Sequence, residues 1–317
     1  MQVIPQRLQF HGEGAKFFGI LIVNLILTIV TLGLYYPWAR AKTLQYLYGE
    51  AEFAGSRFQF HGTGQEMFKG FIKAVLIIGV LFIVYQVAQA SGNIAIALIG
   101  TLVYFLGIVA IIPVAIHGGL RYRMSRTSWR GIHFGYRGNL TELVKIVFKG
   151  VLLTVLTLGI YGSWLSINIR NYCIGHIRLG NVRFRYNGNG GDFFWLNFKG
   201  MFLTVITFGI YSFWYAKNLN NYYIDNIKLI QDDNEFSFNS TLDAGDIFAT
   251  GIINYFLVVF TLGLGTPWAL LRQIRMVINN VELDGAFNPE TVLQTEEAYT
   301  NATGDDMLDM LDIGLDF

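Results

Sequence analysis

Long apolar runs alternate with short, recurring signatures along this chain. Four of the runs end in related stretches: TLGLYYPW (31–38), TLGIYGSW (157–164), TFGIYSFW (207–214) and TLGLGTPW (261–268). A second signature, in which aromatic and polar positions alternate, occurs between the runs: FQFHG (58–62), FGYRG (134–138), FRYNG (184–188) and FSFN (236–239). The long runs predict apolar helices, and the alternating stretches predict short strands of β-hairpins.

The two signatures recur together and divide the chain into five units. Aligning the second aromatic residue of each alternating stretch with Phe10, which marks the first unit, gives intervals of 50, 76, 50 and 52 residues, which is typical of a repeat architecture. Each unit predicts an apolar helix, a glycine-containing bend, a second helix that begins near the tryptophan, and a β-hairpin. The predicted boundaries are 1–63, 64–138, 139–188, 189–239 and 240–287, with a tail at 288–317. The second unit is longer and contains two full apolar runs, at 71–88 and 94–116.

The apolar runs predict a membrane protein. The chain is 53% hydrophobic and 14% charged, whereas soluble domains average about 25% charged residues. We therefore predict an all-α, multi-pass membrane protein of about five tandem helical hairpins, with short cytoplasmic β-hairpins between them. The apolar run that starts at Phe17 lacks a cleavage pattern and is expected to be an uncleaved first membrane segment.

The depth of the short units has two interpretations. A second helix of roughly 12 residues reaches only ~18 Å, against a bilayer core of ~30 Å. The units are therefore either membrane-embedded, partly re-entrant hairpins, or single-crossing first helices followed by interfacial second helices. The bends lack Lys and Arg, while basic residues gather on the hairpin side. The positive-inside rule then predicts cytoplasmic hairpins and cytoplasmic termini.

A polar stripe follows one face of the second helices, at positions four, seven and eleven after the tryptophan. Its candidate members are Lys42, Gln45, Arg121, Asn168, Asn171, Asn218, Asn221, Asp225, Arg272 and Arg275. Charged and amide groups at membrane depth usually face a protein interior or a water-filled space, so the stripe could line a polar pathway. The alternative is that the stripe faces headgroups from an interfacial helix. Trp38, Trp164, Trp214 and Trp268 are predicted interface anchors.

Other chemistry is not indicated by the sequence. There is one cysteine, Cys173, and we find no nucleophile elbow, phosphate-binding loop, zinc spacing or paired carboxylates. We therefore expect no enzymatic activity, metal, cofactor or nucleic-acid partner. The stretch 286–317 holds eight acidic residues and no Lys or Arg, whereas the remainder holds 23 basic and 14 acidic residues. The expected partner of this basic body is the lipid bilayer. The acidic tail is either a flexible solubilising segment or a segment that binds a protein partner or the basic hairpins.

On these signatures the sequence resembles the YjgN family of bacterial inner-membrane proteins, over about residues 5–285. The stretches 35–42 and 58–64 carry the resemblance most clearly. It implies a multi-pass protein of the inner membrane, but the family is classed as a domain of unknown function and supplies no catalytic residues. Two functions stay open: a transporter or channel-like protein that uses the polar stripe, and a non-enzymatic scaffold or adaptor that acts through the basic hairpins and the acidic tail.

Overall fold

The computed structural model describes residues 6–295, except 233 and 286. In this part of the chain the helices are α1 (Gly14–Val30), α2 (Tyr36–Gly49), α3 (Gly64–Ala90), α4 (Ile94–Ser125), α5 (Leu140–Leu156), α6 (Gly162–Gly175), α7 (Gly190–Ile206), α8 (Ser212–Asp225), α9 (Ala244–Phe260) and α10 (Thr266–Ile278). The strands are β1 (Gln6–Phe10), β2 (Ala51–Phe53), β3 (Ser56–Phe60), β4 (Thr127–Trp129), β5 (Ile132–Tyr136), β6 (Ile177–Leu179), β7 (Val182–Tyr186), β8 (Ile227–Gln231), β9 (Asn234–Ser240) and β10 (Val281–Leu283).

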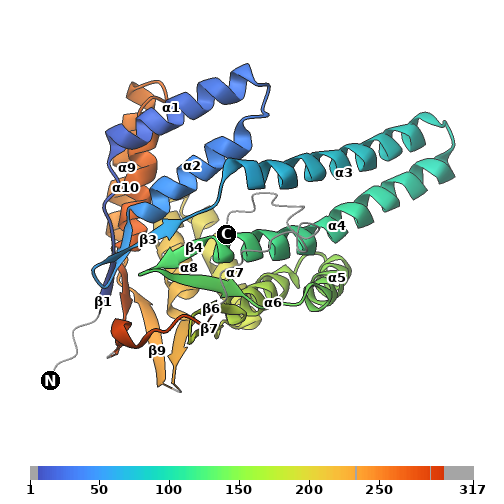
Figure 1. Cartoon of the computed structure of the whole chain (residues 1–317). Coiled ribbons are helices and arrows are strands. Elements are labelled where there is room, and N and C mark those ends of the chain that lie inside the picture. The colour runs from blue at the N-terminus through green and yellow to red at the C-terminus, as the bar shows by residue number, and fades with distance from the viewer. Residues whose placement is uncertain (1–5, 233, 286, 296–317) are drawn as a thin grey trace.

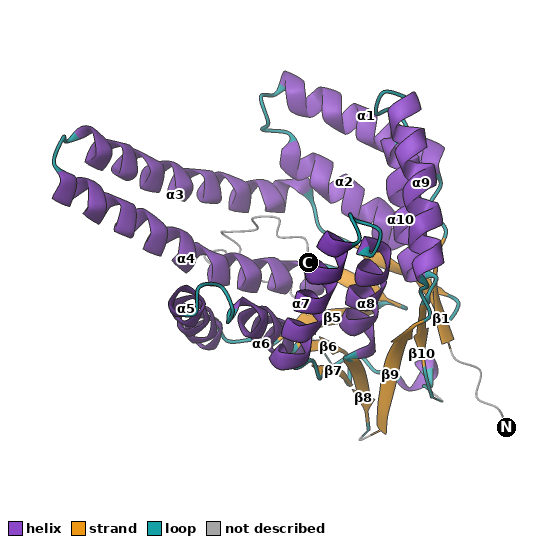
Figure 2. Ribbon diagram, turned by 180° about the vertical axis from the view of Figure 1, so that it is seen from behind, coloured by secondary structure: helices purple, strands orange, loops and turns teal. Residues whose placement is uncertain are grey.

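The strands form one closed antiparallel barrel in the order β1-β10-β9-β8-β7-β6-β5-β4-β3-β2, and β2 pairs with β1. Two kinds of connection alternate around it. Tight turns join β2 to β3, β4 to β5, β6 to β7 and β8 to β9. A helical hairpin joins β1 to β2, β3 to β4, β5 to β6, β7 to β8 and β9 to β10. The order strand–helix–helix–strand therefore occurs five times. The barrel lies at one end of the molecule, the helices extend away from it, and the α3–α4 hairpin projects farthest (Figure 1, Figure 2).

The prediction of an all-α fold is wrong, because these strands are the structural centre of the molecule. We expected short hairpins between helical units, which could pair into one cytoplasmic sheet because isolated hairpins are marginal in water. Here the strands pair side by side around the whole ring, and β1 pairs with β10 to join the two ends of the array. Closure removes every unpaired edge. It also places the two strands that flank each helical hairpin next to one another.

The barrel interior is filled by apolar side chains. One set comes from the strands that precede each helical hairpin and a second set from the strands that follow it. The first set comprises Leu8, Phe58, Phe134, Phe184 and Phe236, and the second comprises Phe53, Trp129, Leu179, Leu229 and Leu283. Neighbouring strand positions such as Arg57, Arg183 and Arg185 are exposed. This inward and outward alternation explains the aromatic–polar pattern of the sequence signature.

The segment after β10 closes the end of the barrel away from the helices. Phe287 and Val292 are buried against the interior cluster. The segment continues along the β6–β7 turn, where the Asn181 N–H donates to the Leu293 carbonyl at 3.1 Å and the Leu293 N–H donates to Asn181 Oδ1 at 2.9 Å. Glu290 forms an ion pair with Arg130 at 2.6 Å. Residues 288–295 thus pack on the barrel, whereas the remainder of the predicted tail, 296–317, lies outside the described residues.

Candidate functional site

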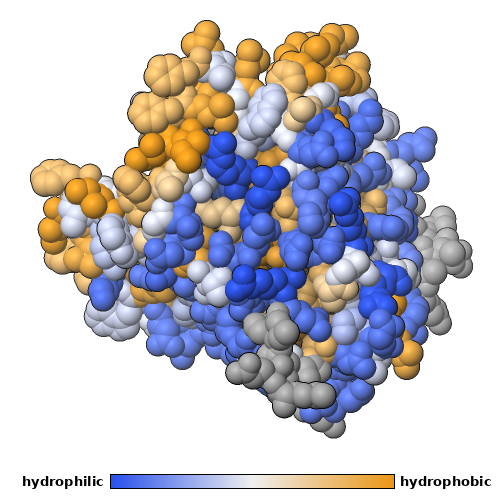
Figure 3. Space-filling model, turned by 90° about the vertical axis from the view of Figure 1, so that its left-hand side faces the viewer, coloured by the Kyte–Doolittle hydropathy of each residue, from blue (hydrophilic) through white to orange (hydrophobic). Residues whose placement is uncertain are grey.

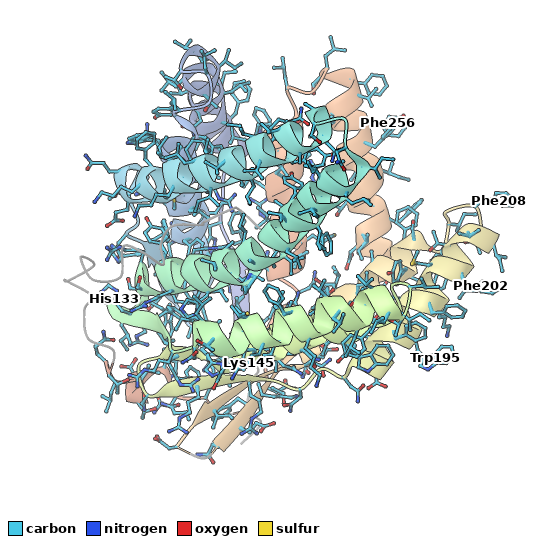
Figure 4. The ribbon with its side chains drawn as sticks, turned by 90° about the vertical axis from the view of Figure 1, so that its right-hand side faces the viewer. His133, Lys145, Trp195, Phe202, Phe208 and Phe256 are labelled. Carbon is cyan, nitrogen blue, oxygen red and sulfur yellow. The ribbon has the colours of Figure 1, made fainter. Side chains whose placement is uncertain are left out.

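The most unusual surface of the molecule is the apolar end formed by the helices. Hydrophobic side chains gather at the top and left edge of Figure 3, away from the polar surface that covers the rest of that view. Figure 4 shows Phe202 and Phe208 at the outer end of the α7–α8 hairpin and Phe256 on α9. A large, continuous exposed apolar surface marks a contact with a membrane or with another protein. We therefore treat the outer helical surface as the candidate functional site.

The tips of the four short hairpins are the most exposed apolar points. Leu32, Leu158, Phe208 and Leu262 are 94–98% exposed. Each has a positive φ of 49–51°, and the glycine that follows it also has a positive φ, between 90 and 96°. The left-handed backbone turns the chain sharply and directs a large apolar side chain outward. Glycine suits the second position because it has no Cβ to oppose this conformation.

The backbone N–H groups of each of these tips are hydrogen-bonded within their own hairpin. In the stretches 31–36, 157–162, 207–212 and 261–266 every backbone N–H has an acceptor in the same hairpin. The threonine hydroxyl is central to this arrangement. In the first bend, Thr31 Oγ1 donates to the Leu27 carbonyl at 2.7 Å and accepts the Tyr35 N–H at 2.9 Å. Irregular backbone can enter hydrocarbon only when its polar groups are satisfied internally, and these bends meet that condition for their N–H groups.

The tip of the α3–α4 hairpin differs in chemistry. It consists of Gln89, Ala90, Ser91, Gly92 and Asn93, and all of these are exposed. Its side chains bond locally: Asn93 Oδ1 accepts the Ala95 N–H at 2.9 Å, and Gln89 Nε2 donates to Thr101 Oγ1 at 3.0 Å. The exposed polar side chains of this tip suit it to contact with water. The chain thus carries four apolar, self-satisfied tips and one polar tip.

Helix length separates the same two groups. By length and apolar composition, α3 and α4 are the two described helices that could cross a membrane, with 27 and 32 residues. At ~1.5 Å per residue they measure roughly 40 and 48 Å. The first helices of the short hairpins have 17 residues, or roughly 25 Å. That is less than the ~30 Å of a bilayer core.

Close helix contacts hold the long hairpin together. A Cβ added at Gly100 would lie 2.2 Å from the Ala88 Cβ, and one added at Gly107 would lie 2.8 Å from a Leu81 methyl group. Small residues that allow backbones to approach are the usual means of packing helices within lipid.

The predicted polar stripe is engaged largely in local structure. Its middle members reach the glycine that follows the next β-hairpin. Gln45 donates to the Gly62 carbonyl at 2.9 Å, beyond β3, and Asn171 donates to the Gly188 carbonyl at 3.3 Å, beyond β7. Arg275 closes the ring in the same way, through the Gly12 carbonyl at 2.5 Å. These contacts fasten the inner ends of α2, α6 and α10 to the barrel rim.

The other stripe residues occupy varied surroundings. Lys42 lies over the Tyr35 ring at 5.8 Å, Arg272 donates to Asn254 Oδ1 at 3.2 Å, and Asp225 accepts the Ser240 N–H at 2.7 Å. Arg121 and Asn221 are half-buried, whereas Asn168 and Asn218 are exposed. The polar pathway stays a prediction.

The predicted tryptophan anchors pack against the start of the next first helix. A Cβ added at Gly64 would meet the Trp38 ring at 2.4 Å, and Gly190 and Gly14 stand in the same relation to Trp164 and Trp268. Trp214 is 48% exposed. The close contacts explain why glycine begins α1, α3 and α7. Anchoring at a membrane interface stays a prediction.

Tyrosines follow the middle position of the stripe in several second helices, and the sequence pattern alone assigned them no role. Tyr46, Tyr172 and Tyr222 each accept the backbone N–H and donate to the carbonyl of a residue 33 positions earlier, at the start of the first helix. Each tyrosine hydroxyl therefore fastens the two helices of one hairpin at their inner ends. The constant spacing was a signal that could have revealed this pairing.

Charge is also divided along the long hairpin. Lys69 and Lys73 lie near the barrel end of α3, and Arg123 and Arg126 lie at the barrel end of α4. Arg126 pairs with Glu66 at 2.8 Å. From residue 74 to 120 the chain holds no Asp, Glu, Lys or Arg. The basic residues thus lie at the barrel end of the hairpin, and the stretch from 74 to 120 is uncharged. By the positive-inside rule, this charge distribution is typical of a membrane hairpin whose basic end faces the cytoplasm.

These features define a class of protein in which a small closed β-barrel carries a crown of apolar helical hairpins. The chain belongs to the family described as "Bacterial protein of unknown function (DUF898)", whose model matches residues 5–196 and 218–310. It is 31% identical over 159 residues to "Inner membrane protein YjgN" of Escherichia coli strain K12, which is 50% of this chain and 38% of that protein. It is 32% identical over 155 residues to the protein of the same name from Salmonella typhimurium strain LT2, which is 48% of this chain and 37% of that protein.

The matched region therefore spans less than two fifths of these curated relatives. No solved structure matches the chain. The resemblance to the YjgN family noted from the sequence signatures is confirmed.

Proposed function

We propose that this chain is a non-enzymatic scaffold embedded in the bacterial inner membrane. In this proposal the α3–α4 hairpin crosses the bilayer, the four short hairpins enter it from one side without crossing, and the barrel lies in the cytoplasm. The observation that carries the proposal is the contrast between four apolar, self-satisfied tips and one polar tip on a longer hairpin. The name of the relatives supports the inner membrane as the location.

The orientation follows from charge and depth. A basic base on α3–α4 favours a cytoplasmic barrel, and its polar tip would then emerge in water on the far side. The short hairpins present apolar first helices of roughly 25 Å, which would enter beyond one leaflet of ~15 Å but stop short of the far headgroups. Their tips can lie in hydrocarbon because the bend N–H groups are already bonded.

The filled barrel favours a scaffold over a pathway. Ten apolar side chains occupy its interior, and Phe287 and Val292 close the end away from the helices. An interior filled in this way by described residues argues against an aqueous route along the barrel axis. Its outer surface, by contrast, alternates charged and polar positions that could bind a partner. A scaffold requires a surface that binds a partner, and it does not require a conformational change.

Topology is the first test. In a Cys173→Ser background, single cysteines are placed at Ser91, Ser212 and Gln59, and spheroplasts are treated with a membrane-impermeant maleimide. Ser91→Cys should react from outside, Gln59→Cys only after lysis, and Ser212→Cys only slowly until detergent is added. Outside labelling of Ser212→Cys would mean that the short hairpins cross the bilayer, and a Ser91→Cys that is protected from outside would mean that α3–α4 does not.

The scaffold role needs its own test. A photo-crosslinking amino acid replaces Gln59 on the outer barrel surface or Phe208 at a hairpin tip. The barrel position should capture one defined protein in cells, and the tip position should capture lipid. Lipid capture at both positions would reject the scaffold role while leaving the topology intact.

Transport by the polar stripe is the second candidate function. The observation in its favour is that Lys42, Asn168 and Asn218 are exposed on helices surrounded by apolar surface, where polar groups usually face water or protein. Cysteines at Asn168 and Asn218 that react with impermeant maleimide from both sides of the membrane would favour transport. Reaction from the cytoplasmic side alone would count against it.

A further inference from the structure

An apolar groove lies where the first and the last helical hairpins meet. It has a volume of about 730 Å³, and its lining includes Phe18 of α1, Leu257 and Phe260 of α9, and Trp268 and Arg272 of α10. The helices α1 and α10 pack on each other beside it (Figure 1), and the centroids of the Phe18 and Trp268 rings are 5.3 Å apart. A volume of about 300–1,000 Å³ is the usual size of a site that binds a small molecule.

Of the residues that line this groove, Arg272 is the one that carries a charge. The Thr261 hydroxyl, which also lines the groove, is bonded within the bend. The Arg272 guanidinium donates to Asn254 Oδ1 at 3.2 Å. The Asn254 amide is oriented by its own bond to the Ala269 carbonyl, at 3.1 Å. Asn254 therefore holds the guanidinium at the groove.

An amide oxygen carries no charge, so within the described part of the chain Arg272 has no acidic partner. Charged side chains at membrane depth are costly and are usually paired. Two cations on other second helices do have such partners: Lys217 pairs with Asp243 at 3.6 Å, and Arg170 lies 4.0 Å from the centroid of the Tyr223 ring. A guanidinium has five N–H donors, so Arg272 can bind an anion while it keeps its bond to the amide.

The groove extends from Arg272 to the tip of the α9–α10 hairpin. Arg272 lies six residues after the start of α10, or about 9 Å from that end. Beyond it, Phe260, Leu262 and Leu264 line the groove and are 61–94% exposed. In the proposed topology the tip lies in hydrocarbon and the inner end of the hairpin faces the cytoplasm. A ligand along the groove would therefore have its charged end toward the cytoplasm and its apolar end toward the bilayer centre.

We propose that this groove binds one anionic phospholipid of the cytoplasmic leaflet. Its phosphate accepts hydrogen bonds from Arg272, and one acyl chain lies along Phe18, Leu257 and Phe260 toward the tip. The N–H donors of a guanidinium can match two phosphate oxygens at once, and basic pockets between membrane helices on the cytoplasmic side bind anionic headgroups. The proposal rests on the membrane placement proposed above, because the orientation of the groove follows from it.

Lipid counting by native mass spectrometry tests this site. The purified full-length protein, in an uncharged detergent, is titrated with phosphatidylglycerol or with phosphatidylcholine of the same acyl chains. One phosphatidylglycerol should bind before all others, and an equal amount of phosphatidylcholine should not displace it. Arg272→Gln should weaken the binding of this lipid at least about tenfold, because a charged hydrogen-bond donor to the phosphate is lost.

Two further variants separate the groove from charge alone. Lys42 has the same place on α2 as Arg272 on α10, four residues after the tryptophan, but it lies over the Tyr35 ring. Lys42→Gln is therefore the matched control and should leave the binding unchanged. Leu264→Trp tests the apolar wall. Leu264 is 61% exposed, so the larger indole can enter the groove without disturbing the core, and this variant should lose the lipid. It decides the question if Arg272→Gln does not fold.

Three results would overturn the site. They are equal losses in Arg272→Gln and Lys42→Gln, binding that survives Leu264→Trp, and displacement of the lipid by glycerol phosphate, which has the phosphate without the acyl chains. The topology is judged separately, by the maleimide test in spheroplasts. A failed lipid count with the expected labelling of Ser91→Cys and Ser212→Cys would reject the lipid site alone. Outside labelling of Ser212→Cys would reject the membrane placement, whatever the lipid count.

Discussion

Replacing Thr207 by valine tests whether the bend after α7 lies in hydrocarbon. The Thr207 hydroxyl donates to the Leu203 carbonyl at 2.7 Å and accepts the Tyr211 N–H at 2.9 Å. The Leu203 carbonyl also accepts the Thr207 N–H at 2.9 Å, so it stays bonded after the substitution. The cost therefore falls on the Tyr211 N–H. In water that loss costs about 0.5–1.5 kcal/mol, whereas an amide without a partner in hydrocarbon costs roughly 2–7 kcal/mol.

The measurement is the free energy of unfolding in lipid bicelles, followed by tryptophan fluorescence during titration with sodium dodecyl sulfate. Thr207→Val should lose at least about 2 kcal/mol, and Thr207→Ser, which keeps the hydroxyl, should lose much less. The matched control is Ser91→Ala at the polar tip, where Ser91 Oγ donates to the Ala88 carbonyl at 2.8 Å. Water can replace that bond, so the expected loss is below about 1.5 kcal/mol. Equal losses for Thr207→Val and Ser91→Ala would refute the placement of the short tips in hydrocarbon.

Three further substitutions test the barrel and its rim, each by the free energy of unfolding. Gly188→Ala puts a Cβ 2.3 Å from the Tyr186 ring and should cost about 1–3 kcal/mol, whereas Gly175→Ala, with open space around it, should be neutral or stabilising; equal effects would contradict the steric argument. The Tyr186 hydroxyl is buried and has no hydrogen-bond partner among the described residues, so Tyr186→Phe should leave stability unchanged or raise it by up to about 1 kcal/mol, and a clear loss would reveal a partner. Phe287→Ala should cost about 3–5 kcal/mol, because this ring is 3% exposed and closes the barrel; a loss below about 1 kcal/mol would mean that the closing segment contributes little.

The apolar pattern identified the helices and the bends because both depend on local sequence. A run of residues from Phe17 onward predicts a helix, and α1 ends at Val30, where Leu32 and Gly33 adopt their left-handed conformations. The glycine of each bend indicated a turn in the sequence, because a backbone with positive φ favours glycine. The polar stripe was also visible. Its contacts were not, because Gln45 and Gly62 meet only when a second helix lies against the following strand.

The barrel could not be derived from the same pattern. Its strands have three to seven residues, so each gives only one or two alternations of apolar and polar positions, and such a short signal fits an isolated hairpin equally well. The decisive pairing, β1 with β10, joins residues near opposite ends of the chain. The alignment of the aromatic signatures fixed the period of the array, but the period does not reveal whether an array closes. The sequence pattern therefore predicts a repeat of two helices and one hairpin. In the structure, the two strands of each such hairpin belong to two adjacent strand–helix–helix–strand elements.

Closure also explains how one repeating fold can carry helical hairpins of two lengths, which the proposed topology places at two membrane depths. Each helical hairpin is attached to the barrel at its inner end by the strands on either side of it. In the α5–α6 hairpin the Tyr172 hydroxyl and the Asn171 side chain add to this attachment. Beyond that attachment the α3–α4 hairpin is largely exposed, and its helices pack mainly on each other. Added length there disturbs no barrel contact, so the length of a hairpin can change independently of the ring. The chemistry of the tip must then follow the length. In the proposed topology, a hairpin that ends inside the bilayer needs a Thr-Leu-Gly or Thr-Phe-Gly bend whose N–H groups are bonded within the hairpin. A hairpin that passes through the bilayer needs a polar turn such as that at 89–93.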